Sequence, residues 1–206
     1  MAIDLDDTNE FAPRTPVMKK RAIGERTKVA IVRFEQRPVK KDGVDVINPR
    51  TGKPRQELVV HGLAMAGTTA ECGSGDDSWT PKPGDPVRVI LRGGGFGQWI
   101  EARKEHRAGK IRVGDELRMV IEHAQAYDAD GNIKGGKITD QADIDNLRRK
   151  GTTIGFYGSL SLAEGTDDSM VTAAERAYRE ATAINLDVPA AAPAPAPAAA
   201  AGGDDW

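Results

Sequence analysis

The chain has 206 residues, of which 39% are hydrophobic, and its formal net charge is −2. No stretch approaches the roughly 20 apolar residues that a membrane-spanning helix needs, so we expect a soluble protein with one folded domain. The acidic start lacks the basic and apolar regions of a secretory signal, which indicates a cytoplasmic location. The single cysteine, Cys72, excludes an internal disulfide, and three scattered histidines give no zinc-ligand spacing. We therefore expect no metal and no other cofactor.

The charges are distributed unevenly along the chain. Residues 19–162 hold 26 Lys and Arg against 19 Asp and Glu, a net of +7, whereas residues 1–18 carry −3 and residues 163–206 carry −6. This asymmetry predicts a body that binds polyanions, with acidic ends. We divide the chain into a disordered acidic N-terminus (1–18), a nucleic-acid-binding domain (19–162), a helical segment (163–188) and a disordered Ala/Pro-rich linker with an acidic tip (189–206).

Three predicted strands come first in the body. Lys28–Phe34 is rich in β-branched residues and is followed by Pro38, which lacks the N–H that a strand needs. Glu57–Leu63 is the second strand, and Val87–Arg92 is the third, with the period-two alternation of a sheet that has one buried face. Turn residues and five cations fill the segment between the first two strands, which predicts a long basic loop.

A glycine run separates the third strand from a predicted helix. Gln98–Ala108 contains good helix formers and ends at Gly109, a typical C-terminal cap. Glycine loops before helices can bind phosphate groups, but Gly93–Gly97 is followed by Gln98 and by no Gly-Lys-Ser/Thr, so neither nucleotide-binding motif fits. We interpret the run as a flexible turn. An enzyme that binds a nucleotide at this loop is an alternative, although we find no catalytic site.

Two more strands and two helices complete the predicted order. Glu116–Glu122 and Thr152–Leu160 are the fourth and fifth strands, joined by a long basic connection from about residue 124 to 151 that ends in a short helix. Asp167–Ile184 has a capping-box pattern and an apolar stripe, which predicts a C-terminal helix.

This order is that of an OB fold. We predict a mostly β protein, with a five-stranded OB-fold-like barrel, a helix between strands three and four, a C-terminal helix and disordered tails. In OB folds, the face of strands two and three and the loops between strands one and two and between four and five bind oligonucleotides or oligosaccharides. Both of these loops are basic in this chain, which supports the predicted topology.

Binding of single-stranded nucleic acid requires cations for the backbone and aromatic rings on which bases stack. We expect Trp99 and Phe156 in the core and an exposed ring at Trp79, while for Phe34 and Tyr157 both burial and stacking are open. The candidate stacking residues are Phe34, Trp79, Phe96, Tyr127 and Tyr157. The candidate cations are Lys40, Lys41, Lys53, Arg55, Arg88, Arg92, Arg118, Lys134, Lys137, Arg148, Arg149 and Lys150.

The last residues form a separate candidate site. A tether of Ala, Pro and Gly precedes Asp204, Asp205 and Trp206, an aromatic and acidic tip that can enter a pocket with a basic rim on a partner protein. The alternative is a chance end to a low-complexity tail.

A basic OB-like body, an Ala/Pro/Gly linker and an acidic aromatic tip together resemble bacterial-type single-stranded-DNA-binding proteins, which end in acids followed by Pro-Phe where this chain has Asp204-Asp205-Trp206. Residues 114–119 and 150–158 further resemble single-stranded-DNA-binding proteins encoded by phages of actinobacteria, and the general similarity covers about residues 27–160. The resemblance implies protection of replication or recombination intermediates in an infected cell.

We therefore predict a non-enzymatic protein that binds single-stranded DNA without sequence preference and recruits replication or recombination proteins through its tip, as a possible homo-oligomer. The alternative is a phage structural or assembly protein whose β-domain contacts other proteins and whose basic loops form the rims of those contacts.

Overall fold

A computed structural model describes residues 15–49, 51–73, 77–128 and 132–186. Over these residues the chain is mostly β, with one large antiparallel sheet and three α-helices. The elements in chain order are β1 (Met18–Lys19), β2 (Arg26–Pro38), β3 (Lys40–Lys41), β4 (Val44–Asp45), β5 (Gln56–Ala64), β6 (Glu71–Cys72), β7 (Pro86–Arg92), α1 (Gly94–Glu105), a 3₁₀ turn (His106–Gly109), β8 (Glu116–Tyr127), β9 (Ile133–Ile138), α2 (Gln141–Arg149), β10 (Thr153–Ala163) and α3 (Asp168–Leu186).

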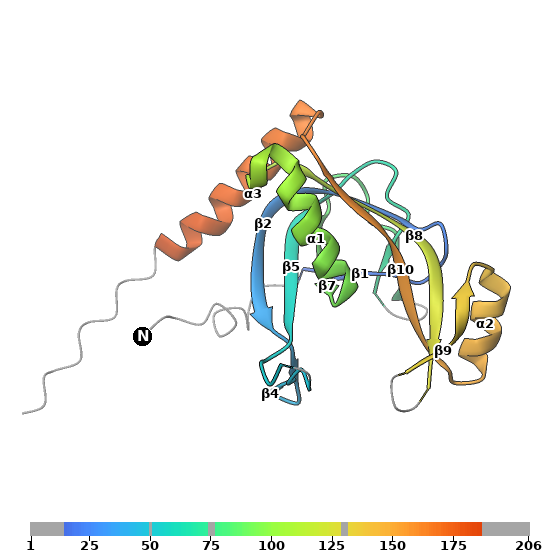
Figure 1. The fold of residues 1–206 in the computed structure, drawn as a ribbon. Coiled ribbons are helices and arrows are strands. Elements are labelled where there is room, and N and C mark those ends of the chain that lie inside the picture. Colours follow the sequence, from blue (N-terminus) through green and yellow to red (C-terminus); the bar gives the residue numbers. More distant parts are fainter. Residues whose placement is uncertain (1–14, 50, 74–76, 129–131, 187–206) are drawn as a thin grey trace, which may run out of the picture.

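The large sheet is open and strongly curved (Figure 1). Its strand order is β10-β8-β2-β5-β7, with β9 paired to the far end of β8. The five predicted strands are confirmed as β2, β5, β7, β8 and β10, and α1 lies between the third and fourth of them as predicted. The closed barrel is not seen, because β7 and β10 do not pair within the described residues. Instead α1 packs against both of these edge strands and covers the gap between them.

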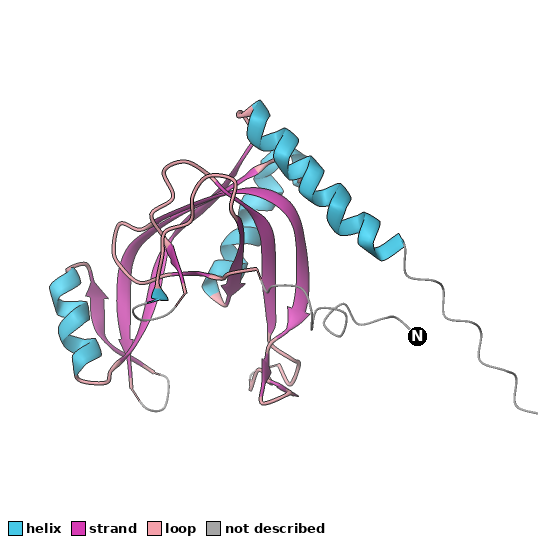
Figure 2. Cartoon of the chain, turned by 180° about the vertical axis from the view of Figure 1, so that it is seen from behind, coloured by secondary structure: helices cyan, strands magenta, loops and turns pink. Residues whose placement is uncertain are grey.

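The main core lies on the concave face, under α1. Alternate residues of β2, β5, β7 and β8 point into it, as the predicted period-two pattern requires. Trp99, 2% exposed, fills the space between α1 and the sheet, which confirms its predicted burial. A second, smaller cluster lies on the opposite face, where Ala174 of α3 packs on Ala30 and Val32 of β2 (Figure 2).

Helix α1 begins four residues earlier than predicted. The glycine run was interpreted as a flexible turn, but Gly94, Gly95 and Gly97 are helical and only Gly93, with φ of 51°, lies in the left-handed region. Glycine disfavours helix formation by about 1 kcal/mol relative to alanine. The docking of Trp99 into the core supplies the tertiary packing that overrides this preference.

Strand β8 runs five residues further than predicted. A β-bulge opposite Tyr157 and Gly158 inserts one extra residue near Glu122, which shifts the alternation that the sequence showed up to that point. The second half, residues 123–127, pairs with both β10 and β9 and forms an arm beyond the end of β2. The predicted connection between strands four and five therefore contains an additional strand, β9, while the short helix predicted at its end is confirmed as α2.

The folded body begins before residue 19. Residues 15–18 were assigned to a disordered N-terminus, but Met18 is 6% exposed in the main core and pairs with Cys72, and Val17 bridges to Arg88. Hydrophobic contact explains this correction, since Met18 belongs to the main core cluster and its short strand contacts β6 and β7. The other residues of the predicted tails, 1–14 and 187–206, lie outside the described residues.

Gly158 tests the register at the bulge. Replacement by alanine would place a Cβ on the carbonyl oxygen of Val120 in the neighbouring strand. We expect Gly158→Ala to lower the free energy of unfolding by about 1–3 kcal/mol in urea denaturation. Gly97→Ala is the matched control, because a Cβ there meets open space within a helix and should raise stability by up to about 1 kcal/mol. Equal effects of the two changes would contradict the register.

Candidate nucleic-acid interface

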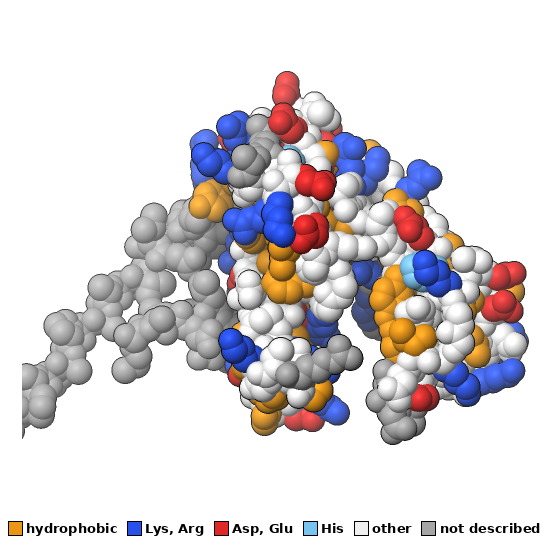
Figure 3. Space-filling model, in the orientation of Figure 1, with side chains coloured by type: hydrophobic (Ala, Val, Ile, Leu, Met, Phe, Trp, Pro, Cys, Tyr) orange, Lys and Arg blue, Asp and Glu red, His pale blue; other side chains and the backbone are white. Residues whose placement is uncertain are grey.

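The two predicted binding loops lie on the same side of the sheet. The β3–β4 hairpin and the β9–α2 segment both project downward in Figure 1. The surface is hollowed between them, with Lys and Arg side chains at the inner end (Figure 3). We call this hollow, of about 360 Å³, the central groove; it is lined by Lys20, Arg55, Arg92, Gly93, Gly94, Gly95, Gln98, Met119, Val120, Ile121, Gly155, Phe156, Tyr157, Gly158 and Ser159.

A second hollow of about 800 Å³ continues the central groove along the β3–β4 hairpin. The two share Arg55, Arg92 and Gly93, so they form one continuous surface. We call the second the hairpin hollow, lined by Val39, Val46, Asn48, Pro49, Pro54, Arg55, Gln56, Arg92, Gly93 and Phe96. No Asp or Glu is among the described residues that line either one, so the whole surface has a positive charge.

Lys20 supplies a cation that the sequence prediction missed. Its pKa is lowered by burial, and its ammonium forms no hydrogen bond or ion pair with another described residue. Its Nζ lies 3.7 Å from the place that a Cβ of Gly95 would take, at the first turn of α1. That turn contains no acidic residue, and its cap forms no side-chain hydrogen bond. A partly desolvated cation beside free helix N–H groups favours a bound anion.

Arg92 is held at the edge of the groove by a buried carboxylate. Its Nε donates to Glu57, whose other oxygen accepts from Arg37 Nε at 2.9 Å. Glu57 is 4% exposed at its side chain, and Arg92 is 61% exposed. Burial alone would raise the pKa of Glu57, but the hydrogen bonds from Arg92 and Arg37 outweigh it and place the pKa below the usual glutamate value. Because Nε makes the contact with Glu57, the two terminal nitrogens of Arg92 remain as donors that a ligand could use.

Aromatic rings line the β8–β10 arm beside the groove. Tyr157 stacks on His123 with ring centroids 5.5 Å apart, and the rings of Tyr127 and Tyr157 both lie over Gly155. A Cβ at Gly155 would come within 2.8 Å of Tyr127, so the missing side chain makes room for both rings. Phe156, which was predicted to lie in the core, is only half-buried, and the guanidinium carbon of Arg148 lies 5.0 Å from the centre of its ring. The arm thus offers ring faces next to cations, as base stacking requires.

The structure brings only part of the predicted site together. Arg55, Arg92, Phe96 and Tyr157 line the continuous surface. Exposed cations flank it on the hairpin and on the β9–α2 segment: Lys40, Lys41 and Lys53 on the first, and Lys134, Lys137, Arg148, Arg149 and Lys150 on the second. Tyr127 lies on the arm, next to Tyr157.

Four predicted residues lie elsewhere. Arg118 alternates with buried Leu117 and Met119, faces the outer side of the sheet, and pairs with Glu116 at 2.7 Å. Arg88 is half-buried on the outer side of β7. Trp79 is 41% exposed, as predicted, but it belongs to the β6–β7 connection and lines neither hollow. Phe34 contacts Trp99 in a separate pocket under α1. Strand alternation fixed which side chains leave the core, but not which of them share a surface.

The residues that the prediction missed had a partial signal. Lys20 belongs to a run of three cations, Lys19–Arg21, at the point where the acidic N-terminal segment ends. No signal in the sequence pointed to Gln98, which also lines the groove, because its role depends on the gap between α1 and β10. Asp204, Asp205 and Trp206 lie outside the described residues.

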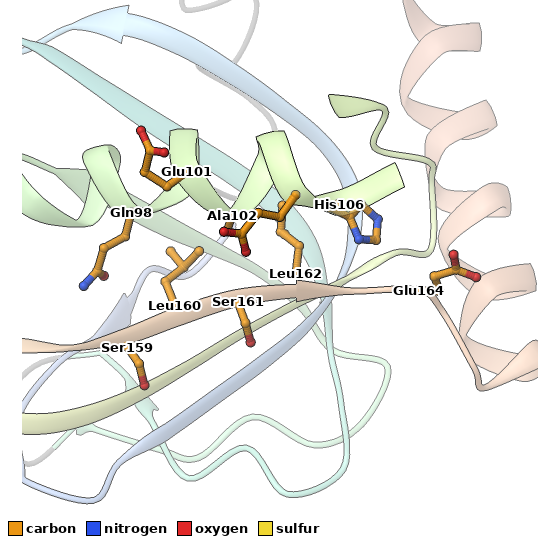
Figure 4. A pocket seen from close by; sticks show the side chains of 10 residues that line it. Gln98, Glu101, Ala102, His106, Ser159, Leu160, Ser161, Leu162 and Glu164 are labelled. Atoms are coloured by element: carbon orange, nitrogen blue, oxygen red, sulfur yellow. The ribbon is translucent and has the colours of Figure 1, made fainter. Parts of the chain in front are cut away.

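An acidic cavity of about 600 Å³ lies on the other side of Gln98 (Figure 4). In Figure 4, Leu160 and Leu162 point from β10 toward α1, while Ser159 and Ser161 point away. Its acidic lining residues are Glu101, Glu105 and Glu164. Gln98 Nε2 donates to the carbonyl oxygen of Gly158 at 2.7 Å, and this bridge separates the acidic cavity from the central groove. A polyanion is therefore favoured on one side of the bridge only.

Neither a metal-binding cluster nor a membrane-spanning helix is found among the described residues. No group of three or more His, Cys, Asp or Glu side chains in the described part of the chain is placed to hold a metal ion. Within the same residues, no helix is both long and apolar enough to cross a membrane. Comparisons with models of protein families, with curated proteins and with solved structures found no match.

The Glu57 network predicts a pH-dependent stability. A carboxylate whose pKa is depressed in the folded state stabilises the fold above its unfolded pKa, and this contribution is lost as the pH falls through the folded pKa. We expect Glu57→Gln to cost about 1 kcal/mol at pH 7, because Arg37 and Arg92 lose their shared partner. Urea unfolding at pH 7 and at about pH 3 measures this. If the free energy of unfolding of Glu57→Gln differed from that of wild type by the same amount at both pH values, the assigned ion pairs would be contradicted.

Proposed function

We propose that this chain binds single-stranded DNA without sequence preference and without enzymatic activity. The observation that carries the proposal is the continuous surface of central groove and hairpin hollow, which combines Lys20, Arg55 and Arg92 with no carboxylate among its described lining residues. Cations along a groove bind a phosphate backbone electrostatically. The glycines at the start of α1 add backbone N–H groups to the same surface.

The aromatic residues favour a single strand over a duplex. A ring such as that of Tyr157 can stack only on a base whose face is not already covered by a neighbouring base pair. Tyr157 and Phe156 line the central groove, and Phe96 lines the hairpin hollow, so ring faces occur at both ends of the cationic surface.

The topology supports an OB-like interpretation of the open sheet. Reading β2, β5, β7, β8 and β10 as OB strands one to five, every antiparallel pair of that fold is present, and the helix follows strand three. OB folds are partly open barrels, and here α1 covers the open seam between β7 and β10. The central groove then lies between the two loops that bind nucleic acid in OB folds.

The resemblance to phage single-stranded-DNA-binding proteins extends this proposal to a biological role. We infer that the protein protects replication or recombination intermediates in the cytoplasm of an infected cell. Recruitment of replication or recombination proteins by Asp204, Asp205 and Trp206 is part of the same proposal and rests on the sequence alone.

Fluorescence anisotropy with labelled oligo-dT and with a duplex of equal length, over a salt series, tests DNA binding. We expect preference for the single strand and a log–log salt slope of about −3 to −4, which corresponds to roughly four to six neutralised phosphates. Arg55→Gln and Arg92→Gln should each weaken binding and reduce the slope by about 0.7. The matched control is Arg118→Gln, which removes a cation from the outer face and should change neither value. Equal, weak binding to both DNAs would instead favour the phage assembly protein.

Deletion of residues 204–206 tests the tip separately. We expect the affinity for oligo-dT to stay the same or rise, because two negative charges are removed, while capture of replication or recombination proteins from host extract is lost. Loss of DNA binding on deletion would place the tip inside the DNA site and contradict the recruitment role.

A further inference from the structure

Another pocket lies where α1 crosses the C-terminal part of β2 and the N-terminal part of β5. Its volume is about 390 Å³, and we call it the α1 pocket. It is lined by Phe34, Gln36, Leu58, Phe96, Trp99, Ile100, Arg103, Lys104 and Gly109. Three of these nine residues are aromatic and two are cationic, and no described carboxylate lines the pocket. This composition differs from that of the acidic cavity on the other side of the same helix.

The walls of the α1 pocket are rings held in place by the core. Trp99 is buried and anchors the helix, and Phe34 meets it edge to face with centroids 5.3 Å apart. Ile100, 41% exposed, adds an apolar side chain to the lining of the pocket. Phe96 lines both this pocket and the hairpin hollow, so the pocket is a side branch of the cationic surface.

The rim of the α1 pocket carries a positioned cation. Arg103 Nε donates to the carbonyl oxygen of Gly109 at 3.1 Å, and its guanidinium carbon lies 5.6 Å from the centre of the Phe34 ring. These two contacts fix the plane of the guanidinium while its terminal nitrogens keep their donors for a ligand. Lys104 lies beside it and pairs with Glu101 at 2.8 Å. An aromatic floor under a fixed guanidinium suits a flat ring that carries negative charge nearby.

We propose that the α1 pocket takes one unstacked nucleobase of the bound single strand, with Arg103 on the phosphate or on the polar edge of that base. The inference rests on the proposed function, because a strand bound in the hairpin hollow would reach the pocket past Phe96, which lines both. Continuity with the cationic surface favours a base over an aromatic side chain from a partner protein. The pocket would then hold the strand by stacking, and not by charge alone.

The experiment compares two DNA strands of equal length and charge, oligo-dT and a fully abasic oligomer, on the full chain. Phe34→Leu removes the ring from the pocket floor and keeps an apolar side chain of similar reach. We expect it to weaken binding of oligo-dT about tenfold, within the range for one base stack, and to change binding of the abasic oligomer less than twofold. Tyr178→Leu, at an exposed aromatic on α3, is the matched control and should change neither.

Equal losses on the two strands, or no loss on either by folded Phe34→Leu protein, would overturn the base pocket; in the second case the pocket is left for a protein ligand. Wild-type protein that does not prefer oligo-dT over a duplex would contradict the proposed function itself, which is a separate outcome.

Photo-crosslinking of wild-type protein to oligo-dT that contains 5-iodo-deoxyuridine gives an independent test if Phe34→Leu fails to fold. Peptide mapping of the adducts should find Phe34 or Trp99, which line the α1 pocket but neither the central groove nor the hairpin hollow. Adducts at Tyr127 and Tyr157 alone would place every stacked base on the β8–β10 arm and overturn the proposal.

Discussion

The contact of Trp99 with the concave face of the sheet fixes the position of α1, and the four hollows that this helix lines depend on it. The Trp99 side chain belongs to the same buried cluster as Leu91 of β7 and Leu117 of β8, so it joins the helix to both halves of the open sheet. Because a core side chain of this size cannot move without leaving a cavity, the helix keeps one orientation. The start of α1 then faces the central groove, while its two flanks face the acidic cavity and the α1 pocket.

This arrangement separates opposite charges over a short distance. The Gln98–Gly158 hydrogen bond spans the gap between α1 and β10, with cations on one side and glutamates on the other. Like charges repel, so a phosphate backbone near the bridge is directed toward Lys20 and Arg92 and away from Glu101 and Glu105. In the proposed function the acidic side limits where the strand can run, and the cationic side determines its affinity. The formal net charge of −2 gives no indication of this division.

The open sheet places the aromatic side chains as well. Since β8 continues past the end of β2, its second half pairs only with β10 and β9 and forms an arm with an accessible face. The bulge opposite Tyr157 and Gly158 changes which residues face outward at this point, and it brings His123 and Tyr157 together. A closed barrel would leave less of this surface exposed. The ring faces beside the groove therefore result from the β-bulge in β8 and from the lack of pairing between β7 and β10 in the described residues.

The sequence by itself determined the local structure: the five main strands, the helix after the third and the burial of Trp99 followed from period-two patterning, turn residues and side-chain size. The positive charge of the two long connections followed from composition. The same patterning gave the wrong start for α1 and the wrong end for β8, because the docking of Trp99 overrides glycine propensity and a bulge breaks the alternation. Only the tertiary structure decided which cations and rings share a surface. Arg92 and Arg118 look alike in an alternating strand, but Glu57 holds Arg92 at the groove while Glu116 binds Arg118 on the outer face. Glu57 lies 35 residues from Arg92 along the chain, on the neighbouring strand, so this partner cannot be read from residues close together in the sequence. Glu116 is two residues from Arg118, but which face of the strand borders the groove depends on the curvature of the sheet.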